Sequence, residues 1–136
     1  SGVNRDLNRG IIDAREVEKA LEDPASKLFL LSSRVREQIL IRQREKSFHP
    51  RGAQKVLHLS PRVFVLLRTS PEGDESILTI TGVTGETVGL KVPLDKIGQN
   101  RCLYKDLLSG RKYQAVEDAL QLALPPYGRI WLKSEE

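Results

Sequence analysis

The pattern of apolar positions divides the chain into a helical beginning and a longer part made of short extended runs. A first short helix is predicted from Asp13, which can cap its start, to about Glu22, and Glu16 completes a capping-box pattern. A second helix is predicted over residues 25–46. Its apolar residues fall on one stripe at helical spacing: Leu28, Leu31, Val35 and Ile39.

From residue 51 onward the pattern changes to short runs of strand formers separated by turn residues. The predicted runs are 54–59, 63–68, 76–83, 87–92, 103–109, 112–116, 120–124 and 127–133, and residues 94–99 are predicted as a loop. Short strands with hairpin-length connections are typical of an antiparallel β-sandwich. We therefore predict a mainly β fold, with two N-terminal helices in a region 1–50 and an antiparallel β-sandwich in a domain 51–136.

The last run contains the single tryptophan of the chain and is expected to complete the sheet. Pro125 and Pro126 cannot donate ladder hydrogen bonds, so they predict a break between two strands. After the break, strand alternation places Ile130 and Leu132 on one face and Trp131 on the other. We expect Trp131 to pack inside the domain or against the helices.

Apolar residues of the second helix extend beyond its main stripe, because Phe29, Leu30 and Ile41 lie off it. Covering a small sheet needs one stripe, so the surplus indicates a second partner, either another domain or a copy of the chain in a homodimer through helix 25–46. A wide contact between helix and sheet is an equally good interpretation. The residues after this helix, from Phe48 to Gly52, are predicted to be a linker-like break.

Composition and charge narrow the class of protein. The chain has 136 residues, the length of one ordinary domain, and a net charge of +4. Much of the positive charge lies in residues 34–46 and alternates with glutamates, which argues against nucleic-acid binding and favours a solvated surface. With a lone cysteine and without a long apolar run or signal-peptide pattern, the sequence predicts a cytoplasmic protein with no membrane association.

Residues able to carry chemistry are few. Cys102 with His49 or His58 makes a poor nucleophilic or metal site, so we expect a buried thiol, surface histidines, no metal and no cofactor. Acidic residues 72–75 lie in a turn, where solvated carboxylates are the default. The first ten residues alone concentrate polar donors suited to sugars or anions, namely Arg5, Asn8 and Arg9, although the residues by themselves favour a frayed terminus.

Several motifs, in their order along the chain, resemble the C-terminal region of sucrose phosphorylase-like enzymes of the α-amylase superfamily. They are Asn4-Arg-Asp-Leu-Asn-Arg9, Leu40-Ile-Arg-Gln-Arg44, Ser47-Phe-His-Pro50, Val63-Phe-Val-Leu-Leu-Arg68 and Pro126-Tyr-Gly-Arg-Ile-Trp-Leu132. The resemblance covers nearly the whole chain, and its first motif is the most discriminating.

The resemblance implies that residues 1–10 form the loop after the last strand of a (β/α)8 barrel, 25–46 the last barrel helix, and 52–136 the C-terminal β-sandwich. The catalytic acids of such an enzyme would lie before this chain, so the chain by itself would be non-catalytic. In the longer enzyme Arg5 would contact substrate, and Asn8 and Arg9 would support the loop. The implied reaction is retaining glucosyl transfer between a disaccharide-like donor and phosphate, giving glucose 1-phosphate. A stand-alone carbohydrate-binding β-sandwich, which would need exposed aromatic platforms, is the alternative.

Overall fold

The structure, a computed structural model, describes residues 12–98 and 101–135. It divides into two compact units, one up to Leu40 and one from Ile41 onward. The second unit begins within the long helix, and the domain boundary after residue 50 stays a prediction. Each unit is considered by itself.

Two helices lie in the first part of the chain and begin at polar caps. α1 (Ala14–Glu22) is capped by Asp13, whose carboxylate accepts a hydrogen bond of 2.9 Å from the Arg15 amide. α2 (Lys27–Arg44) begins two residues later than predicted because Ser26 is its cap, with the Ser26 hydroxyl accepting from the Phe29 amide at 3.0 Å. The stripe predicted on α2 is solvent-exposed in the structure: Leu28, Leu31, Val35 and Ile39.

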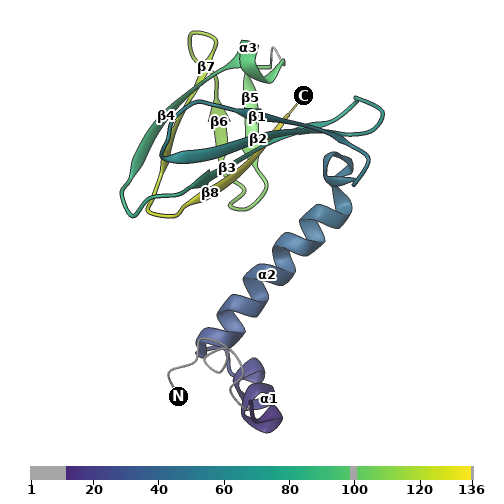
Figure 1. The fold of residues 1–136 in the computed structure, drawn as a ribbon, viewed down its shortest axis with the longest axis vertical. Coiled ribbons are helices and arrows are strands. Elements are labelled where there is room, and N and C mark those ends of the chain that lie inside the picture. The colour runs from purple at the N-terminus through teal and green to yellow at the C-terminus, as the bar shows by residue number, and fades with distance from the viewer. Residues whose placement is uncertain (1–11, 99–100, 136) are drawn as a thin grey trace, which may run out of the picture. The chain divides into compact units, whose positions relative to one another are not determined.

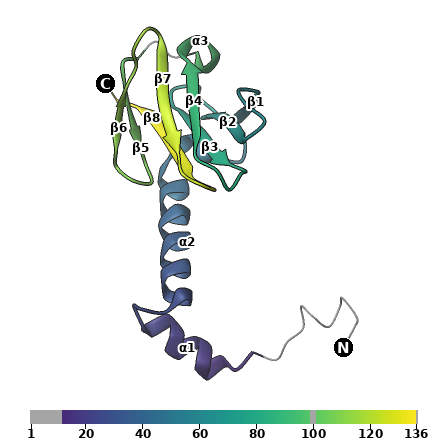
Figure 2. The same cartoon turned by 90° about the vertical axis from the view of Figure 1, so that its left-hand side faces the viewer.

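Two antiparallel sheets form the second unit, which confirms the predicted sandwich (Figure 1). In the part of the chain that the structure describes, the large sheet has the order β1-β2-β3-β8-β5-β6. Its strands are β1 (Ala53–Leu57), β2 (Val63–Thr69), β3 (Ser76–Gly82), β5 (Leu103–Asp106), β6 (Lys112–Gln114) and β8 (Arg129–Ser134). The small sheet pairs β4 (Val88–Pro93) with β7 (Ala119–Leu124), and Figure 2 shows these two strands lying together.

The main core lies between the inner face of the large sheet and the small sheet. Strand alternation turns Val65, Ile80 and Leu132 of the large sheet toward the same buried cluster as Val92 and Leu120 of the small sheet. A short helix, α3 (Leu94–Ile97), adds its two end residues to this cluster. The prediction of a loop over 94–99 was wrong at this point, because two apolar residues three apart can both reach the core only in a helical turn.

One end of the outer face of the large sheet is covered by the end of α2 and the residues that follow it. Trp131 lies on this face, opposite to Ile130 and Leu132 as predicted, and packs with Ile41, Phe48 and Ile77. The rings of Phe48 and Trp131 are 4.9 Å apart between centroids and inclined at 49°. Phe48 belongs to a 3₁₀ turn, η1 (Lys46–Phe48), and is buried. The linker-like break predicted from Phe48 was therefore wrong, because this apolar ring is needed to cover the tryptophan.

The two prolines break the chain between β7 and β8, as predicted, and they begin a tight turn. The Gly128 amide donates to the Pro125 carbonyl at 2.8 Å, and Tyr127 takes a left-handed φ of 53°. A Cβ atom at Gly128 would lie 2.8 Å from that carbonyl oxygen, so the turn needs glycine there. The turn therefore sets the position at which β8 enters the sheet between β3 and β5.

A buried aspartate closes the connection between β5 and β6. Asp106 accepts hydrogen bonds from the amides of Leu108 and Ser109 at 3.1 and 3.2 Å, and from the Trp131 amide at 2.8 Å. The Ser109 hydroxyl also donates to it. Leu107 and Leu108 consequently pack beside Trp131, so this single carboxylate ties the turn to the outer-face cluster.

We expect Trp131→Ala to lower the free energy of unfolding by about 3–5 kcal/mol, because it leaves a cavity under Phe48 and exposes Ile77. Urea melts followed by circular dichroism measure this change. Phe64→Ala is the control, since half of the Phe64 side chain is already exposed. Equal losses for the two variants would contradict a structural role specific to Trp131.

Asp106→Ala should cost about 1–3 kcal/mol, because it leaves buried amide donors without acceptors. Asp106→Asn keeps one side-chain oxygen and is expected to lose less. Chemical denaturation of both variants tests the order, and a larger loss for the asparagine variant would contradict this account.

Candidate functional site

The residues predicted to contact substrate, Arg5, Asn8 and Arg9, lie outside the described residues. Their role therefore stays a prediction. Among the residues that could carry chemistry, the structure describes a charge cluster on the outer face of the large sheet, and this cluster is the candidate site.

The Cys102 thiol and the imidazoles of His49 and His58 are exposed, whereas a catalytic pair needs shielding from solvent. Cys102 is exposed, so the prediction of a buried thiol was wrong. It lies just before β5 in an irregular segment, outside the alternation that buries strand residues. His58 is exposed as predicted, and His49 is exposed with its Nδ1 accepting from the Arg51 amide at 3.2 Å.

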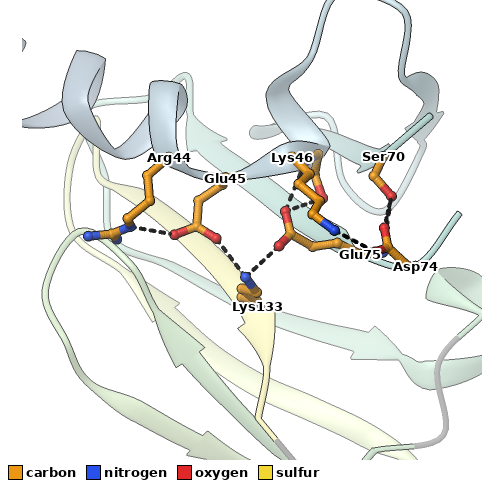
Figure 3. Close-up of polar contacts among 8 residues, drawn as sticks. Arg44, Glu45, Lys46, Ser70, Asp74, Glu75 and Lys133 are labelled. Atoms are coloured by element: carbon orange, nitrogen blue, oxygen red, sulfur yellow. Dashed lines mark hydrogen bonds and ion pairs between the residues drawn. The ribbon is translucent and has the colours of Figure 1, made fainter. Parts of the chain in front are cut away.

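A lysine held between two glutamates forms the centre of the charge cluster (Figure 3). Lys133 Nζ on β8 lies 2.6 Å from Glu45 Oε2 and 2.6 Å from Glu75 Oε2. Glu45 follows the last residue of α2, and Glu75 precedes β3. We call Lys133, Glu45 and Glu75 the lysine clasp, because they join the end of the helix to two adjacent strands.

The two glutamates of the clasp are largely removed from water. The exposed fractions of the side chains are 7% for Glu45, 15% for Glu75 and 33% for Lys133. A carboxylate removed from water is tolerated only with close partners, and each glutamate has them. Glu45 also accepts from Arg44 Nε at 2.9 Å, although the exposed arginine makes this second pair weak.

Hydrogen bonds and burial act in opposite directions on the pKa values in the clasp. Burial alone would raise the pKa of Glu75, but hydrogen bonds from Lys133 and Ser47 outweigh it and lower that pKa. Burial alone would lower the pKa of Lys133, whereas hydrogen bonds to Glu45 and Glu75 raise it. Both shifts in pKa favour the charged form, so Glu75 and Lys133 are charged near neutral pH.

Glu75 also holds the backbone of the 3₁₀ turn. Its Oε1 accepts from the Ser47 amide at 2.9 Å and from the Ser47 hydroxyl at 3.0 Å. Arg68 Nε on β2 donates to the Ser47 carbonyl at 3.0 Å, and its guanidinium lies 5.8 Å from the Phe48 ring centroid. The prediction that Glu75 is a solvated turn carboxylate was wrong, because it accepts hydrogen bonds from a segment distant in sequence.

A groove of about 740 Å³ borders this cluster along the end of α2 and the turn after it. Its lining includes Arg42, Arg44, Lys46, Arg51 and Glu72. Arg42 is stacked over Phe48 at 5.3 Å, and Lys46 pairs with Asp74 at 2.8 Å. The Arg42–Phe48 contact and the Lys46–Asp74 ion pair thus help to position the helix end.

Within the described ranges, no cluster of three or more histidine, cysteine, aspartate or glutamate residues is placed to bind a metal ion. Likewise, none of the described helices has the length and apolarity needed to cross a bilayer. Trp131 is buried, so it offers no platform for the carbohydrate-binding alternative.

A weak signal for the clasp was present in the sequence. Glu45 interrupts a basic run and precedes a buried Ser47-Phe48 pair, and Lys133 follows the apolar positions of the last strand. Neither pattern identifies a partner, since the clasp joins residues separated by 58 and 88 positions.

Comparison with known proteins relates the chain to enzymes of carbohydrate metabolism. No protein-family model matches it. A glucosylglycerate phosphorylase from Spirochaeta thermophila is 29% identical over 97% of this chain and 23% of its own length. A glucosylglycerate phosphorylase from Allomeiothermus silvanus is 28% identical over 97% of the chain and 20% of its own length. The chain thus spans between a fifth and a quarter of these relatives.

Solved structures share the fold. AmyP in complex with maltose aligns with a TM-score of 0.72 at 18% identity, over 79% of this chain and 21% of that chain. An α-amylase from Geobacillus thermoleovorans complexed with acarbose aligns with a TM-score of 0.69 at 20% identity, over 85% of this chain and 25% of that chain. The chain therefore shares the fold of a part of these α-amylase structures, in agreement with the resemblance of its motifs.

The clasp predicts how stability depends on pH. Because the pKa of Glu75 is lowered on folding, this group stabilises the fold at pH values above its pKa in the unfolded state, about 4.3. The contribution is lost as the pH falls through the folded pKa. Because the pKa of Lys133 is raised on folding, this group stabilises the fold at pH values below its pKa in the unfolded state, about 10.4. The contribution is lost as the pH rises through the folded pKa. Lys133→Met removes the cation shared by Glu45 and Glu75 and should cost about 1–3 kcal/mol at pH 7. The cost should begin to shrink near pH 4, as the pH approaches the lowered folded pKa of Glu75.

Urea melts at pH 4 and pH 7 measure this pattern, with Lys46→Met as the matched control. Lys46 pairs with Asp74 at the surface, where its side chain is largely exposed. The control should leave the free energy of unfolding nearly unchanged at both pH values, because an ion pair at the surface contributes little. A pH-independent loss in Lys133→Met would show that packing of the lysine stem, and not its charge, is responsible.

Proposed function

We propose that this chain is the non-catalytic C-terminal part of a retaining glucosyl-transferring phosphorylase. In the proposed reaction phosphate cleaves the glucosidic bond of glucosylglycerate, giving glucose 1-phosphate and glycerate through a covalent glucosyl-enzyme. The observation that carries the proposal is the pair of glucosylglycerate phosphorylases aligned with nearly the whole chain. Their name favours glucosylglycerate over the sucrose that the motif resemblance implied.

The proposed role of the chain itself is structural. The lysine clasp and the Phe48–Trp131 contact hold the end of α2 against the β-sandwich, so they would fix how the preceding part of the enzyme continues into this domain. A partly buried ion network, in which one lysine pairs with two glutamates, sets geometry more strictly than apolar packing alone. We therefore assign the sandwich a stabilising role and place the chemistry in the catalytic barrel.

The polar N-terminal residues are the part of the chain proposed to meet substrate. Arg5 would contact an anionic group, either phosphate or the glycerate carboxylate, because a guanidinium binds both oxygens of such a group. Asn8 and Arg9 would support the loop that carries it. The lone, exposed Cys102 is compatible with a reducing compartment, so we propose a cytoplasmic enzyme.

The exposed stripe of α2 is proposed to pack on the catalytic barrel of the longer enzyme. Leu31 and Val35 are exposed in the structure, and such a row of apolar side chains is a typical contact surface. If the chain is isolated from the barrel, a homodimer through helix 25–46 would bury the same stripe.

The decisive experiment measures glucose 1-phosphate released by the longer enzyme from glucosylglycerate and from sucrose in the presence of phosphate. We expect release from glucosylglycerate, and no release from either glucoside would refute the proposal. Arg5→Ala should lower kcat/KM by about 10–100-fold, the loss of one charged hydrogen bond. Arg62→Ala removes a surface arginine paired with Glu86 and should leave kcat/KM unchanged.

A further inference from the structure

The cross-strand register places the outward side chains of the large sheet in rows. One row runs from Gln54 through Arg68 and Ile77 to Lys133. The next runs from Val56 through Leu66 and Thr79 to Trp131. A third runs from Phe64 through Thr81 to Arg129. The three rows cross the same outer face at successive levels along the strands.

The chain covers this face at one end only. In the first row Ile77 is fully buried, Arg68 donates to the Ser47 and His49 carbonyls, and Lys133 is in the clasp. In the second row only the Trp131 end is buried. Val56 at the other end of that row is 45% exposed, and Phe64 in the third row is 50% exposed.

We call Val56, Phe64 and the half-buried Leu66 between them the bare patch. Val56 lies directly opposite Leu66 in the register, and Phe64 is on the same side of β2 as Leu66. A groove of about 490 Å³, lined by Val56, Phe64 and the loop joining β1 to β2, opens at the same place. β1 is also the edge strand of the sheet, so its outer hydrogen-bonding groups adjoin the patch.

We propose that the bare patch is the surface through which this domain docks on the catalytic part of the longer enzyme, an inference that rests on the proposed function. The relatives are more than four times the length spanned by the chain, so most of such an enzyme lies outside it. The patch continues the face on which Ile41 and Phe48 already pack. A domain that is covalently joined to this one through α2 is therefore anchored beside this face.

The covalent link favours the catalytic part of the longer enzyme over a second copy of the chain as the occupant of the bare patch. A covalently linked domain has a high effective concentration at the face where its linker is anchored, whereas a second copy must be recruited from solution. The chemistry of the patch, aliphatic and aromatic with threonines beside it, fits an uncharged apolar surface on the catalytic part. A charge placed in the patch should therefore disrupt docking without disturbing the domain itself.

Val56→Lys is the direct test, because lysine is well tolerated on an exposed edge strand. In the isolated chain it should leave the melting temperature unchanged. In the longer enzyme it should lower the melting temperature by about 2–4 °C. Val116→Lys is the matched control, since Val116 is 57% exposed in the connection between β6 and β7 and should leave both melting temperatures unchanged.

The outcomes separate this inference from the proposed function. An unchanged melting temperature for Val56→Lys in a longer enzyme that still releases glucose 1-phosphate overturns the docking surface and leaves the function standing. Absence of phosphorolysis in the wild-type longer enzyme refutes the function independently. If Val56→Lys instead converts a dimer of the isolated chain to a monomer in sedimentation and leaves the longer enzyme unaffected, the occupant is a second copy and the proposal is wrong.

Discussion

The contact of Phe48 with Trp131 on the outer face of the large sheet is the interaction on which the rest of the second unit depends. The small sheet covers only the inner face of the large one, so the outward side chains of β3 and β8 need another cover. Phe48 and Ile41 supply it, and the guanidinium groups of Arg42 and Arg68 lie over the phenylalanine ring. Without this cover Trp131 and Ile77 would face water, and the outer face of the large sheet would expose its apolar residues.

Electrostatics gives this apolar contact a defined geometry. Apolar side chains can pack in several orientations with similar energies, whereas Lys133 can satisfy Glu45 and Glu75 only when the helix end lies at one place on the sheet. Glu75 also accepts hydrogen bonds from the amide and the hydroxyl of Ser47. The 3₁₀ turn therefore cannot shift without leaving buried groups unpaired. Packing thus supplies most of the free energy, and the charges select one arrangement.

The relation to known proteins separates fold from function. The aligned amylase structures have identities of 18% and 20%, which establishes a shared architecture and leaves chemistry open. The phosphorylase relatives are nearer in sequence and carry the functional argument. A domain that holds a helix end in place and presents an apolar patch beside it is suited to supporting a larger enzyme, and this is the role that we propose.

The sequence alone determined the features that depend on near neighbours. Alternation along the last strand, the cap at Asp13 and the proline break before β8 were all predicted, because each follows from the φ, ψ and hydrogen-bonding preferences of adjacent residues. The antiparallel sandwich followed from summing such local signals. The interpretation of Arg5, Asn8 and Arg9 rests on resemblance and stays a prediction.

Tertiary structure decided everything that joins distant segments. Burial of Phe48, the pairing of Glu75 with Lys133 and the helical turn at Leu94 depend on which surfaces meet, and a local pattern does not contain that information. The exposure of Cys102 was likewise decided by the path of the chain before β5. Solvation is the default for a carboxylate in a turn, and only a partner brought from another strand, 58 residues away, overturns it.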